Sequence, residues 1–374
     1  RATSATRIEN DNEIQEVAVN TPRLDYSGIG CPSLLLEPES TNLVTQGNDL
    51  SNWSFGRTTR TITDGINPDG TTEEVLVSST SASNGTHRCF SNSDTIIPNE
   101  DYTISVYVKK GTASKIEMEL KTPSEGSDGF GECVFDINNE TITNGKVEVF
   151  NNDWYRIQST GSLNTSTLGR IFIYIYNEDG DRSYVATGNE NLYLWGAQIE
   201  KQSYATSYIP TLGSIETRAA ETLSKDSLSN YINSSEGVLY AELQAISDES
   251  DADRFIYLGD NTATHDNFVS IVYKDVGGEL AAYGVRNGAE SFYIGTTDYT
   301  LTDNLQVAVK WKENDCQLYV NGSLVNTDNS TQDFNFTFTD LKTRKFLGES
   351  FYGNIRDLRV YTTALTDEEL TQLT

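Results

Sequence analysis

The chain has 374 residues, of which 36% are hydrophobic and 22% charged, and its formal charge at pH 7 is −28. This length predicts two or three domains. The negative charge disfavours nucleic acid as a partner, because it repels phosphate backbones and no cluster of Lys or Arg offsets it. No apolar run approaches the roughly 18 residues that a membrane-spanning helix needs. The 20 Tyr and 14 Phe, among many Ser, Thr and Asn, are typical of an all-β protein.

Residues 1–40 are predicted to form an extended N-terminal arm rather than a domain. A short alternating segment contains Ile14 and Val17, and it is followed by Pro22, two glycines and Pro32. The apolar run Leu34 to Leu36 then predicts a first strand, which Pro38 ends. The arm would pack on its own domain or on a neighbouring subunit, and the sequence leaves both alternatives open.

Residues 41–205 contain short apolar-alternating runs separated by turn residues, a pattern that predicts a β-sandwich or jelly roll. In YTISVYVKK, for example, Tyr102, Ile104, Val106 and Val108 alternate with polar residues and would share one face. The clearest strands are expected at 74–78, 102–109, 115–120, 133–136, 146–150, 155–159, 170–176 and 192–200. Asn-Gly, Asp-Gly and Asn-Asn pairs supply the turns between them.

Residues 206–224 are predicted to be a linker. The strand pattern of LYLWGAQIE ends there, and the chain changes to Ser, Tyr, Thr, Pro and Gly, as in YATSYIPTLGS. Such a change in composition is typical of a domain boundary.

Residues 225–374 repeat the strand-and-turn pattern and predict a second sandwich. The expected strands lie in GVLYAELQAI, RFIYLGD, FVSIVYK, LAAYGVR, SFYIGTT, LQVAVKWK, CQLYVNGSLV and FNFTFTD. Asn321-Gly322 is a strong hairpin signal. At the end, Thr366 as N-cap and Glu369 three residues later predict a short C-terminal helix that begins with a capping box. The predicted fold is therefore all-β: two consecutive sandwich domains behind an arm.

The four cysteines, Cys31, Cys89, Cys133 and Cys316, show no CxxC spacing, so a metal or redox motif is absent. Cys89 and Cys133 fall in one predicted domain, where a disulfide or two buried thiols would both be compatible with the sequence. Assembly in a reducing cytosol would favour the thiols.

Several sequence segments resemble those of known protein families. Residues 237–243 (GVLYAEL), 307–325 and 353–370 (GNIRDLRVYTTALTDEEL) resemble a concanavalin A-like lectin/glucanase sandwich of the laminin-G type. Residues 48–58 (NDLSNWSFGRT), 102–111, 153–161 and 192–200 resemble the carbohydrate-binding-module-like jelly roll of tailed-bacteriophage virion proteins, as does GCPSLLLEPESTNLV in the arm. The matching segments belong to the β-sheet framework and contain no predicted ligand-binding residues.

The resemblance implies a non-enzymatic structural protein on the phage virion surface, such as a tail fibre, appendage or decoration. The protein would be made in the host cytoplasm. It would serve assembly and host attachment, and its expected partners are other virion proteins, copies of itself and host cell-surface polysaccharide. Two alternatives stay open: a polysaccharide depolymerase of a phage tail, and a secreted bacterial glycan-binding adhesin.

Catalytic chemistry finds little support in the residues. Only two histidines are present, and His87 and His265 fall in different predicted domains, so a Ser/His/Asp arrangement is hard to build. His87 is expected to be packed or solvated rather than a base. Glu117 and Glu119 share one face of a predicted strand, which would suit a pair of glycosidase carboxylates. A solvated strand face is the favoured interpretation of this pair.

Acidic loops offer oxygen ligands of the kind that Ca²⁺ prefers. Asp248, Asp251 and Asp253 cluster in SDESDADRF, and Asp260 precedes the THDN loop. The resemblance adds that laminin-G and jelly-roll domains often hold a structural Ca²⁺ at their edges. A solvated acidic loop is the alternative for each group.

Sugar binding needs exposed aromatic rings with polar groups beside them. Candidate ligand-binding residues in the second half combine rings with amide, carboxylate and guanidinium groups: His265, Asp266, Tyr283, Arg286, Asn287, Phe292 and Tyr293. Burial in the core is the alternative for the aromatic members, and all four Trp residues are expected in cores.

Overall fold

A computed structural model gives the fold of residues 1–27, 31–80, 83–124, 128–247, 252–260, 262, 264–274, 277–331, 333–334, 336–345 and 349–374. Within these residues nearly all regular structure is β-strand, and the one helix, α1 (Asp367–Leu373), is close to the C-terminus. The all-β prediction is confirmed.

The chain divides into two compact units. The N-terminal unit comprises residues 2–21 and 39–219, and the C-terminal unit comprises Arg1, residues 22–38 and residues 220–374. Residues 1–40, predicted as one arm, are thus shared between the units and contain short strands. β1 (Ala5–Ile8) and β2 (Ile14–Val17) form a hairpin in the N-terminal unit. β3 (Leu24–Asp25) and β4 (Ser33–Leu36) join a sheet of the C-terminal unit.

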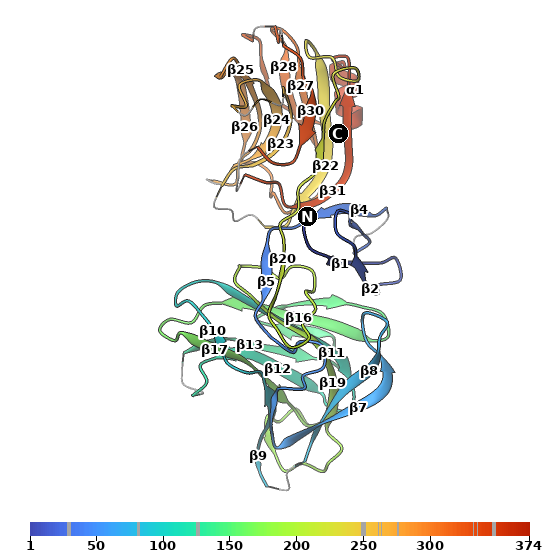
Figure 1. Ribbon diagram of the computed structural model, residues 1–374, viewed down its shortest axis with the longest axis vertical. Coiled ribbons are helices and arrows are strands. Elements are labelled where there is room, and N and C mark those ends of the chain that lie inside the picture. Colours follow the sequence, from blue (N-terminus) through green and yellow to red (C-terminus); the bar gives the residue numbers. More distant parts are fainter. Residues whose placement is uncertain are drawn as a thin grey trace. The chain divides into compact units, whose positions relative to one another are not determined.

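Two antiparallel sheets build the N-terminal unit (Figure 1). The first has the order β15 (Lys146–Val149), β16 (Trp154–Gly161), β11 (Tyr102–Lys110), β19 (Asn191–Glu200), β8 (Thr72–Ser79), β7 (Thr58–Ile66). The second has the order β14 (Thr141–Thr143), β13 (Gly129–Asp136), β12 (Lys115–Lys121), β17 (Leu168–Ile175), β9 (Gly85–Phe90), β18 (Ser183–Tyr184). β6 (Ser54–Gly56) pairs with β9, and β10 (Asp94–Thr95) pairs with β17. A further short pair joins β5 (Ser40–Asn42) to β20 (Glu216–Arg218).

The core of the N-terminal unit lies between these sheets. On β11 the alternating side chains of Ile104, Val106 and Val108 are fully buried there, as the period of two predicts. The side chains of the opposite face also pack, because Tyr107, Trp154, Trp195 and Tyr208 form a second aromatic cluster outside the first sheet. This second cluster buries the central part of the outer face of that sheet.

All four tryptophans are buried, as predicted. Trp53 is 5% exposed and Trp195 2%, while Trp154 and Trp311 are fully buried. The indole N–H of Trp154 donates to the Ile66 carbonyl, and that of Trp311 donates to the Ser234 carbonyl. The four indoles are therefore packing groups rather than a sugar platform.

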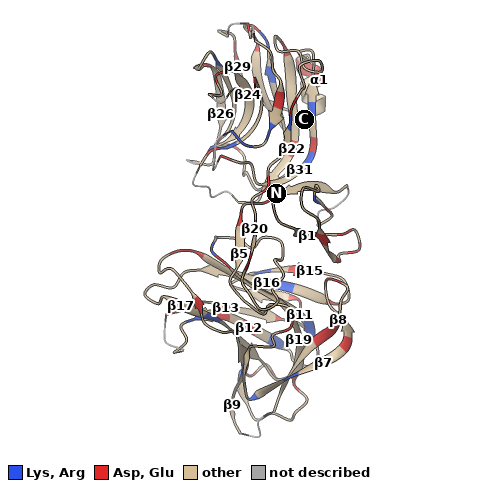
Figure 2. Cartoon of the chain, viewed as in Figure 1, with Lys and Arg blue, Asp and Glu red and all other residues tan. Residues whose placement is uncertain are grey.

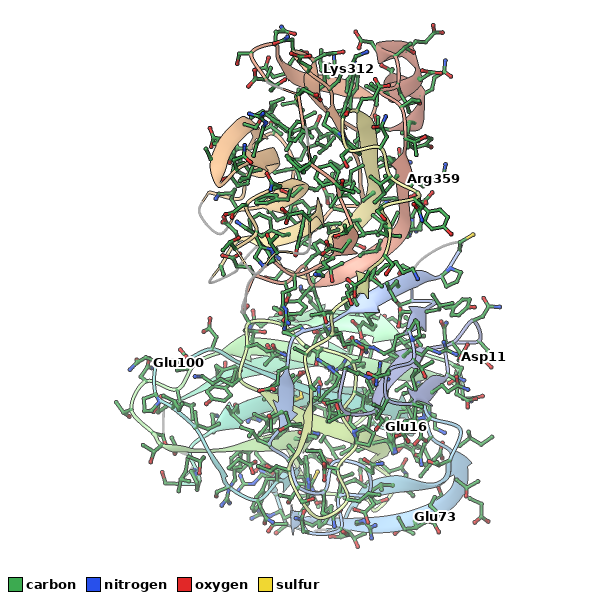
Figure 3. The ribbon with its side chains drawn as sticks, turned by 45° about the horizontal axis from the view of Figure 1, so that its top comes forward. Asp11, Glu16, Glu73, Glu100, Lys312 and Arg359 are labelled. Atoms are coloured by element: carbon green, nitrogen blue, oxygen red, sulfur yellow. The ribbon has the colours of Figure 1, made fainter. Side chains whose placement is uncertain are left out.

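Two sheets also build the C-terminal unit. The six-stranded sheet has the order β21 (Ser224–Lys225), β30 (Asp340–Lys342), β23 (Arg254–Gly259), β24 (Phe268–Tyr273), β25 (Leu280–Arg286), β26 (Ala289–Thr296). The seven-stranded sheet has the order β29 (Ser323–Asp328), β28 (Cys316–Val320), β27 (Leu305–Trp311), β22 (Gly237–Ala245), β31 (Gly353–Tyr361), β4, β3. Apolar side chains fill the space between the sheets, and Figure 3 shows the side chains of both units.

Two local predictions in this unit are confirmed. β28 and β29 pair with Val320 opposite Ser323, so Asn321 and Gly322 form the two-residue turn of a hairpin. At α1 the Thr366 hydroxyl accepts from the Glu369 N–H, and the Glu369 carboxylate accepts from the Thr366 N–H, which is the predicted capping box.

One predicted strand is not formed. In FNFTFTD (residues 334–340), Phe334 and residues 336–339 are not in a strand, and only Asp340 begins β30. The alternation still has a packing role, because the rings of Phe334, Phe336 and Phe338 lie 5.3–6.4 Å from one another and pack in the core. The packing of these three rings therefore explains the alternating pattern of this segment, although its backbone forms no β-ladder.

The cysteines are all free: Cys31 is exposed, and Cys89, Cys133 and Cys316 are buried. Burial raises the pKa of the Cys133 thiol to about 12, so it stays protonated and unreactive.

The described residues contain no helix long and apolar enough to cross a membrane. Figure 2 shows Lys and Arg scattered among acidic residues along the strands of each unit.

Candidate functional site

A row of aromatic rings crosses the outer face of the six-stranded sheet in the C-terminal unit. Ile256 and Leu258 on β23 point into the core, so Tyr257 between them points outward. The ring centroids follow one another from strand to strand at 5.4–5.9 Å, in the order His265, Tyr257, Phe268, Tyr283, Tyr293. These five residues together with Phe255, whose ring is 6.4 Å from Phe268, form what we call the aromatic face.

The aromatic face is open at one end and covered at the other. Phe255, Tyr257 and Phe268 are no more than 2% exposed, whereas Tyr283 and Tyr293 are half-buried. Lys345 Nζ lies 4.8 Å from the centre of the Phe255 ring and 4.7 Å from that of Phe268, a cation–π arrangement. Burial also lowers the pKa of Lys345. The rings that a ligand could reach are therefore those on β25 and β26.

Polar groups fix the orientation of the rings. The Tyr293 hydroxyl donates to Glu279 Oε2 at 2.6 Å, and the Tyr257 hydroxyl lies 3.2 Å from His265 Nδ1. Burial lowers the pKa of His265, and repulsion from Lys345 acts in the same direction. A neutral His265 can exchange a hydrogen bond with a hydroxyl group in either direction. The face thus carries hydrogen-bonding groups at both ends.

The loops beside the face bring together three of the predicted residues. The Gly288 N–H donates to the Asp266 carbonyl at 2.9 Å, which holds the two hairpin loops side by side. The Asn287 N–H donates to Asn267 Oδ1 at 2.8 Å. Both His265 and Asn287 have a positive φ, at 51° and 52°. Asp266, His265 and Asn287 therefore lie at one end of the sheet, and Arg286 ends β25 at the same end.

Phe292 does not belong to the aromatic face. It is 1% exposed and packs in the core, where its ring lies 6.2 Å from that of Phe334. Opposite it on β25 stands Gly284, where a Cβ atom would come within 2.2 Å of the Phe292 ring. Phe292 occupies the inward position of β26, and Tyr293 the outward one. The prediction that Phe292 binds a ligand is wrong, because its ring points into the core and not to the outer face of the sheet.

The aspartates predicted to bind Ca²⁺ do not come together in the part of the chain that the structure describes. Asp248 and Asp251 lie outside the described residues. Asp253 forms an ion pair with Lys274 at 2.5 Å. Asp260 accepts from Thr262 Oγ1 at 2.8 Å and Asn267 Nδ2 at 2.7 Å; burial opposes ionisation, but these bonds lower its pKa. No group of three His, Cys, Asp or Glu side chains suited to a metal ion occurs in the described ranges.

Glu117 and Glu119 are not on the solvated strand face that the sequence suggested. They are 3% and 0% exposed on the outer face of β12, where Arg182 lies over both. Arg182 Nη2 is 2.9 Å from Glu117 Oε1 and 3.6 Å from Glu119 Oε1, and its guanidinium stacks 4.0 Å from the Tyr174 ring. Burial raises the pKa of Glu117, and the hydrogen bond from Tyr176 opposes this. Lys121 Nζ lies 2.7 Å from Glu119 Oε2, so Arg182 and Lys121 together balance the charge of the two carboxylates, and Arg182 covers them.

His87 is packed within the N-terminal unit, as expected. It is fully buried on β9 and stacks on Tyr184 with ring centroids 4.2 Å apart. Its two ring nitrogens lie 2.9 Å from the Arg57 carbonyl and 3.1 Å from the Tyr184 carbonyl. It has a structural position and no access for a substrate.

The sequence interpretation missed four residues of the site: Phe255, Tyr257, Phe268 and Lys345. The three aromatic ones could have been found, because they alternate with the core residues of RFIYLGD and FVSIVYK and so take the outward positions. Lys345 carries no such signal, because it lies outside any strand, after β30, and contacts rings that are about 80 to 90 positions away in the sequence.

The chain is an all-β protein of two β-sandwich units, and the outer face of the six-stranded sheet in its C-terminal unit is aromatic. Residues 239–371 match the family model described as concanavalin A-like lectin/glucanases superfamily. No curated protein matches the chain.

Among solved structures, the chain is similar to the Ruminococcus gnavus IT-sialidase CBM40 bound to α2,3-sialyllactose, with 17% identity over 41% of this chain and 98% of that chain and a TM-score of 0.34. It is also similar to the CBM22-1 xylan-binding domain from Paenibacillus barcinonensis Xyn10C, with 13% identity, coverage of 44% and 94%, and a TM-score of 0.26. Domains LG4-5 of the mouse laminin α1 chain give 11% identity, coverage of 74% and 89%, and a TM-score of 0.25. TM-scores this low support no conclusion about ligand or partner.

Proposed function

We propose that this chain is a glycan-binding, non-enzymatic structural protein of a tailed-phage virion surface, and that the aromatic face of its C-terminal unit takes the glycan. One observation carries the glycan assignment: the segment that matches the lectin/glucanase family model, residues 239–371, also carries the row of outward-facing rings.

Tyr283 and Tyr293 would contact the sugar. Their ring centroids lie 5.8 Å apart with the ring planes inclined by 66°. Both rings are half-buried, so each offers part of an aromatic surface with little further loss of side-chain freedom. Sugar C–H faces stack on such rings, while hydroxyl groups need nearby donors and acceptors. Glu279, Asp266 and Asn287 are the polar groups best placed to supply them.

The virion assignment has separate support. The order of arm, jelly-roll-like unit, linker and lectin-like unit resembles that of phage virion proteins, and the charge of −28 would keep a crowded assembly soluble. Other virion proteins or copies of this chain would be its assembly partners. A secreted bacterial adhesin would carry the same glycan-binding face, and immunogold labelling separates the two: label on phage particles supports the virion assignment, and label only on bacterial cells overturns it.

A depolymerase is the enzymatic alternative. The observation against it is that Arg182 covers Glu117 and Glu119, the carboxylate pair best placed for glycosidase chemistry. A depolymerase would release reducing ends from capsular polysaccharide, and Glu117→Gln would abolish that release. Release that depends on Glu117 would overturn the non-enzymatic assignment.

A glycan array of neutral and acidic sugars, run with and without Ca²⁺, tests glycan binding. We expect Tyr283→Ala and Tyr293→Ala each to weaken binding about tenfold, the equivalent of about 1.4 kcal/mol. Tyr231→Ala is the matched control, because Tyr231 is 73% exposed in the same unit and lies outside the aromatic face. Equal binding by all three variants would overturn the assignment of the face.

A further inference from the structure

A groove of about 570 Å³ lies at one end of the N-terminal unit. The end of β11, the start of β16 and the turn between β13 and β14 enclose it, and Tyr155 and Tyr193 supply its two aromatic rings. Polar side chains form most of the remaining wall: Lys109, Lys110, Asn138, Glu140, Asn152 and Asp153. Its volume is within the roughly 300–1,000 Å³ range of small-molecule sites.

Two ordered turns build the polar side of the groove. The backbone N–H groups of Asn138 and Asn139 both donate to Asp136 Oδ1 at 3.1 Å, which fixes the turn after β13. In the turn before β16, Asn152 and Asp153 adopt φ values of 53° and 63°, a conformation that Asn and Asp tolerate better than most residues. The side chains of Asn138, Asn152 and Asp153 are exposed at the groove. The turns therefore present these side chains from a fixed backbone.

The two rings are held from behind. Tyr155 packs on Phe135 with centroids 5.1 Å apart, and its hydroxyl donates to Glu140 Oε1 at 2.8 Å. Burial raises the pKa of Tyr155 to about 12, so its hydroxyl remains a donor at neutral pH. The Tyr193 ring lies 4.7 Å from Lys109 Nζ. Neither ring needs to reorganise to receive a ligand.

The net charge of the groove wall favours uncharged ligands over anionic ones. Lys109 forms an ion pair with Glu74, which neutralises it. The charges left on the wall are those of Lys110, Glu140 and Asp153, so the groove has a small negative excess. This excess disfavours phosphate, sulfate and uronic acids. No group of three His, Cys, Asp or Glu side chains that could hold a metal exists in the described residues.

We infer that this groove binds an uncharged hexose unit of a polysaccharide, as a second glycan site of the chain. The inference depends on the proposed glycan-binding function and extends it to the N-terminal unit. Tyr193 stacks on a sugar face, and Tyr155, which pairs beside Val108 on the opposite face of the sheet, borders the groove from the other side. The side chains of Asn138, Asn152 and Asp153 exchange hydrogen bonds with the hydroxyl groups. Binding does not need Ca²⁺.

Affinity electrophoresis of the full chain tests this site, with gels that contain dextran, laminarin, galactomannan or polygalacturonate. A neutral polysaccharide is expected to retard the chain, and Tyr193→Ala is expected to raise the apparent Kd about tenfold. Because Tyr193 lies against a buried aromatic cluster, Asn138→Ala and Asp153→Gly serve as second variants at exposed turn positions. Asn92→Ala, at an exposed position outside the groove, is the control.

The double variant Tyr283→Ala/Tyr293→Ala separates this inference from the proposed function. If it keeps binding to a neutral polysaccharide that the groove variants then remove, the groove is the second site. If a neutral polysaccharide retards the chain but the groove variants match the control, the groove inference is overturned and the aromatic face stands. Failure of every neutral polysaccharide to retard the chain also overturns the groove inference, while the array with acidic glycans still decides the aromatic face.

Discussion

Arg23 and Glu221 form a buried ion pair across 198 positions of the sequence, with Arg23 Nε donating to Glu221 Oε1 at 3.0 Å. Arg23 Nη2 also lies 2.7 Å from Glu37 Oε2, and Arg1 Nη1 lies 2.9 Å from Glu221 Oε1. The C-terminal unit consists of Arg1, residues 22–38 and residues 220–374, and these four residues come from all three segments. The network therefore ties together segments that the sequence separates widely.

Loss of Arg23 should destabilise the C-terminal unit strongly. Arg23→Ala leaves Glu37 and Glu221 buried without their shared cation, and breaking such a buried pair costs about 3–5 kcal/mol. Urea denaturation followed by tryptophan fluorescence measures the loss. Arg7→Ala is the control, because the Arg7–Glu9 pair is partly exposed and should contribute less than about 1 kcal/mol. Equal effects of the two variants would contradict the role of the network.

Asp94 should make the N-terminal unit less stable as the pH rises. Burial raises the pKa of Asp94 from 3.8 to about 7, although Arg170 opposes the shift. The folded state therefore holds a proton that the unfolded chain loses above about pH 4. The stability that this proton confers is fully present below pH 4 and is lost as the pH rises through 7.

Asp94→Asn should reduce this dependence, because the amide stays neutral across the range. The measurement is the free energy of unfolding at pH 4.5 and pH 8, and the difference between the two values should shrink in the variant. Asp101→Asn, at an exposed position, should leave it unchanged. An undiminished difference in Asp94→Asn would show that other groups cause the pH dependence.

Arg182→Ala should weaken the N-terminal unit more at pH 8 than at pH 5. Burial already raises the pKa of Glu117, and without the Arg182 charge this pKa should rise further. The penalty of the uncompensated carboxylate is then present at high pH and relieved as the pH falls through the raised value. Arg182→Lys keeps the charge and should show a smaller pH effect in the same unfolding measurements. Equal losses for Arg182→Ala at both pH values would contradict this reasoning.

Sequence patterns predicted the regular strands well, because in each sandwich one face of a strand must be apolar. The expected strands at 102–109 and 192–200, for example, correspond to β11 and β19. Patterns did not predict how residues 1–40 divide between the units, because β3 and β4 are short and are held by distant partners on β31 and by the Arg23 network.

The candidate site was predictable only in part. Tyr283 and Tyr293 were predicted because their aromatic rings and hydroxyl groups suit sugar binding. Phe292 was assigned to the wrong face of the sheet, because nothing in the sequence shows that its ring packs over Gly284 in the core. The buried state of Glu117 and Glu119 could not be read from β12 alone, because Arg182 reaches them from a distant loop. Side-chain packing across the sheet, rather than strand periodicity, decides these positions.

The Asn321-Gly322 turn should be a sensitive point of the C-terminal unit. Asn321 has φ 49° and Gly322 has φ 78°, so both central residues of the hairpin are left-handed, as a type I′ turn requires. An alanine at position 322 would carry a Cβ in this region, at a cost of about 1–2 kcal/mol. Gly322→Ala should therefore lower the Tm by a few degrees in thermal unfolding followed by circular dichroism. Ser323→Ala, at an exposed neighbouring position, should leave the Tm nearly unchanged, and a Gly322→Ala variant as stable as that control would argue against a strained turn at this hairpin.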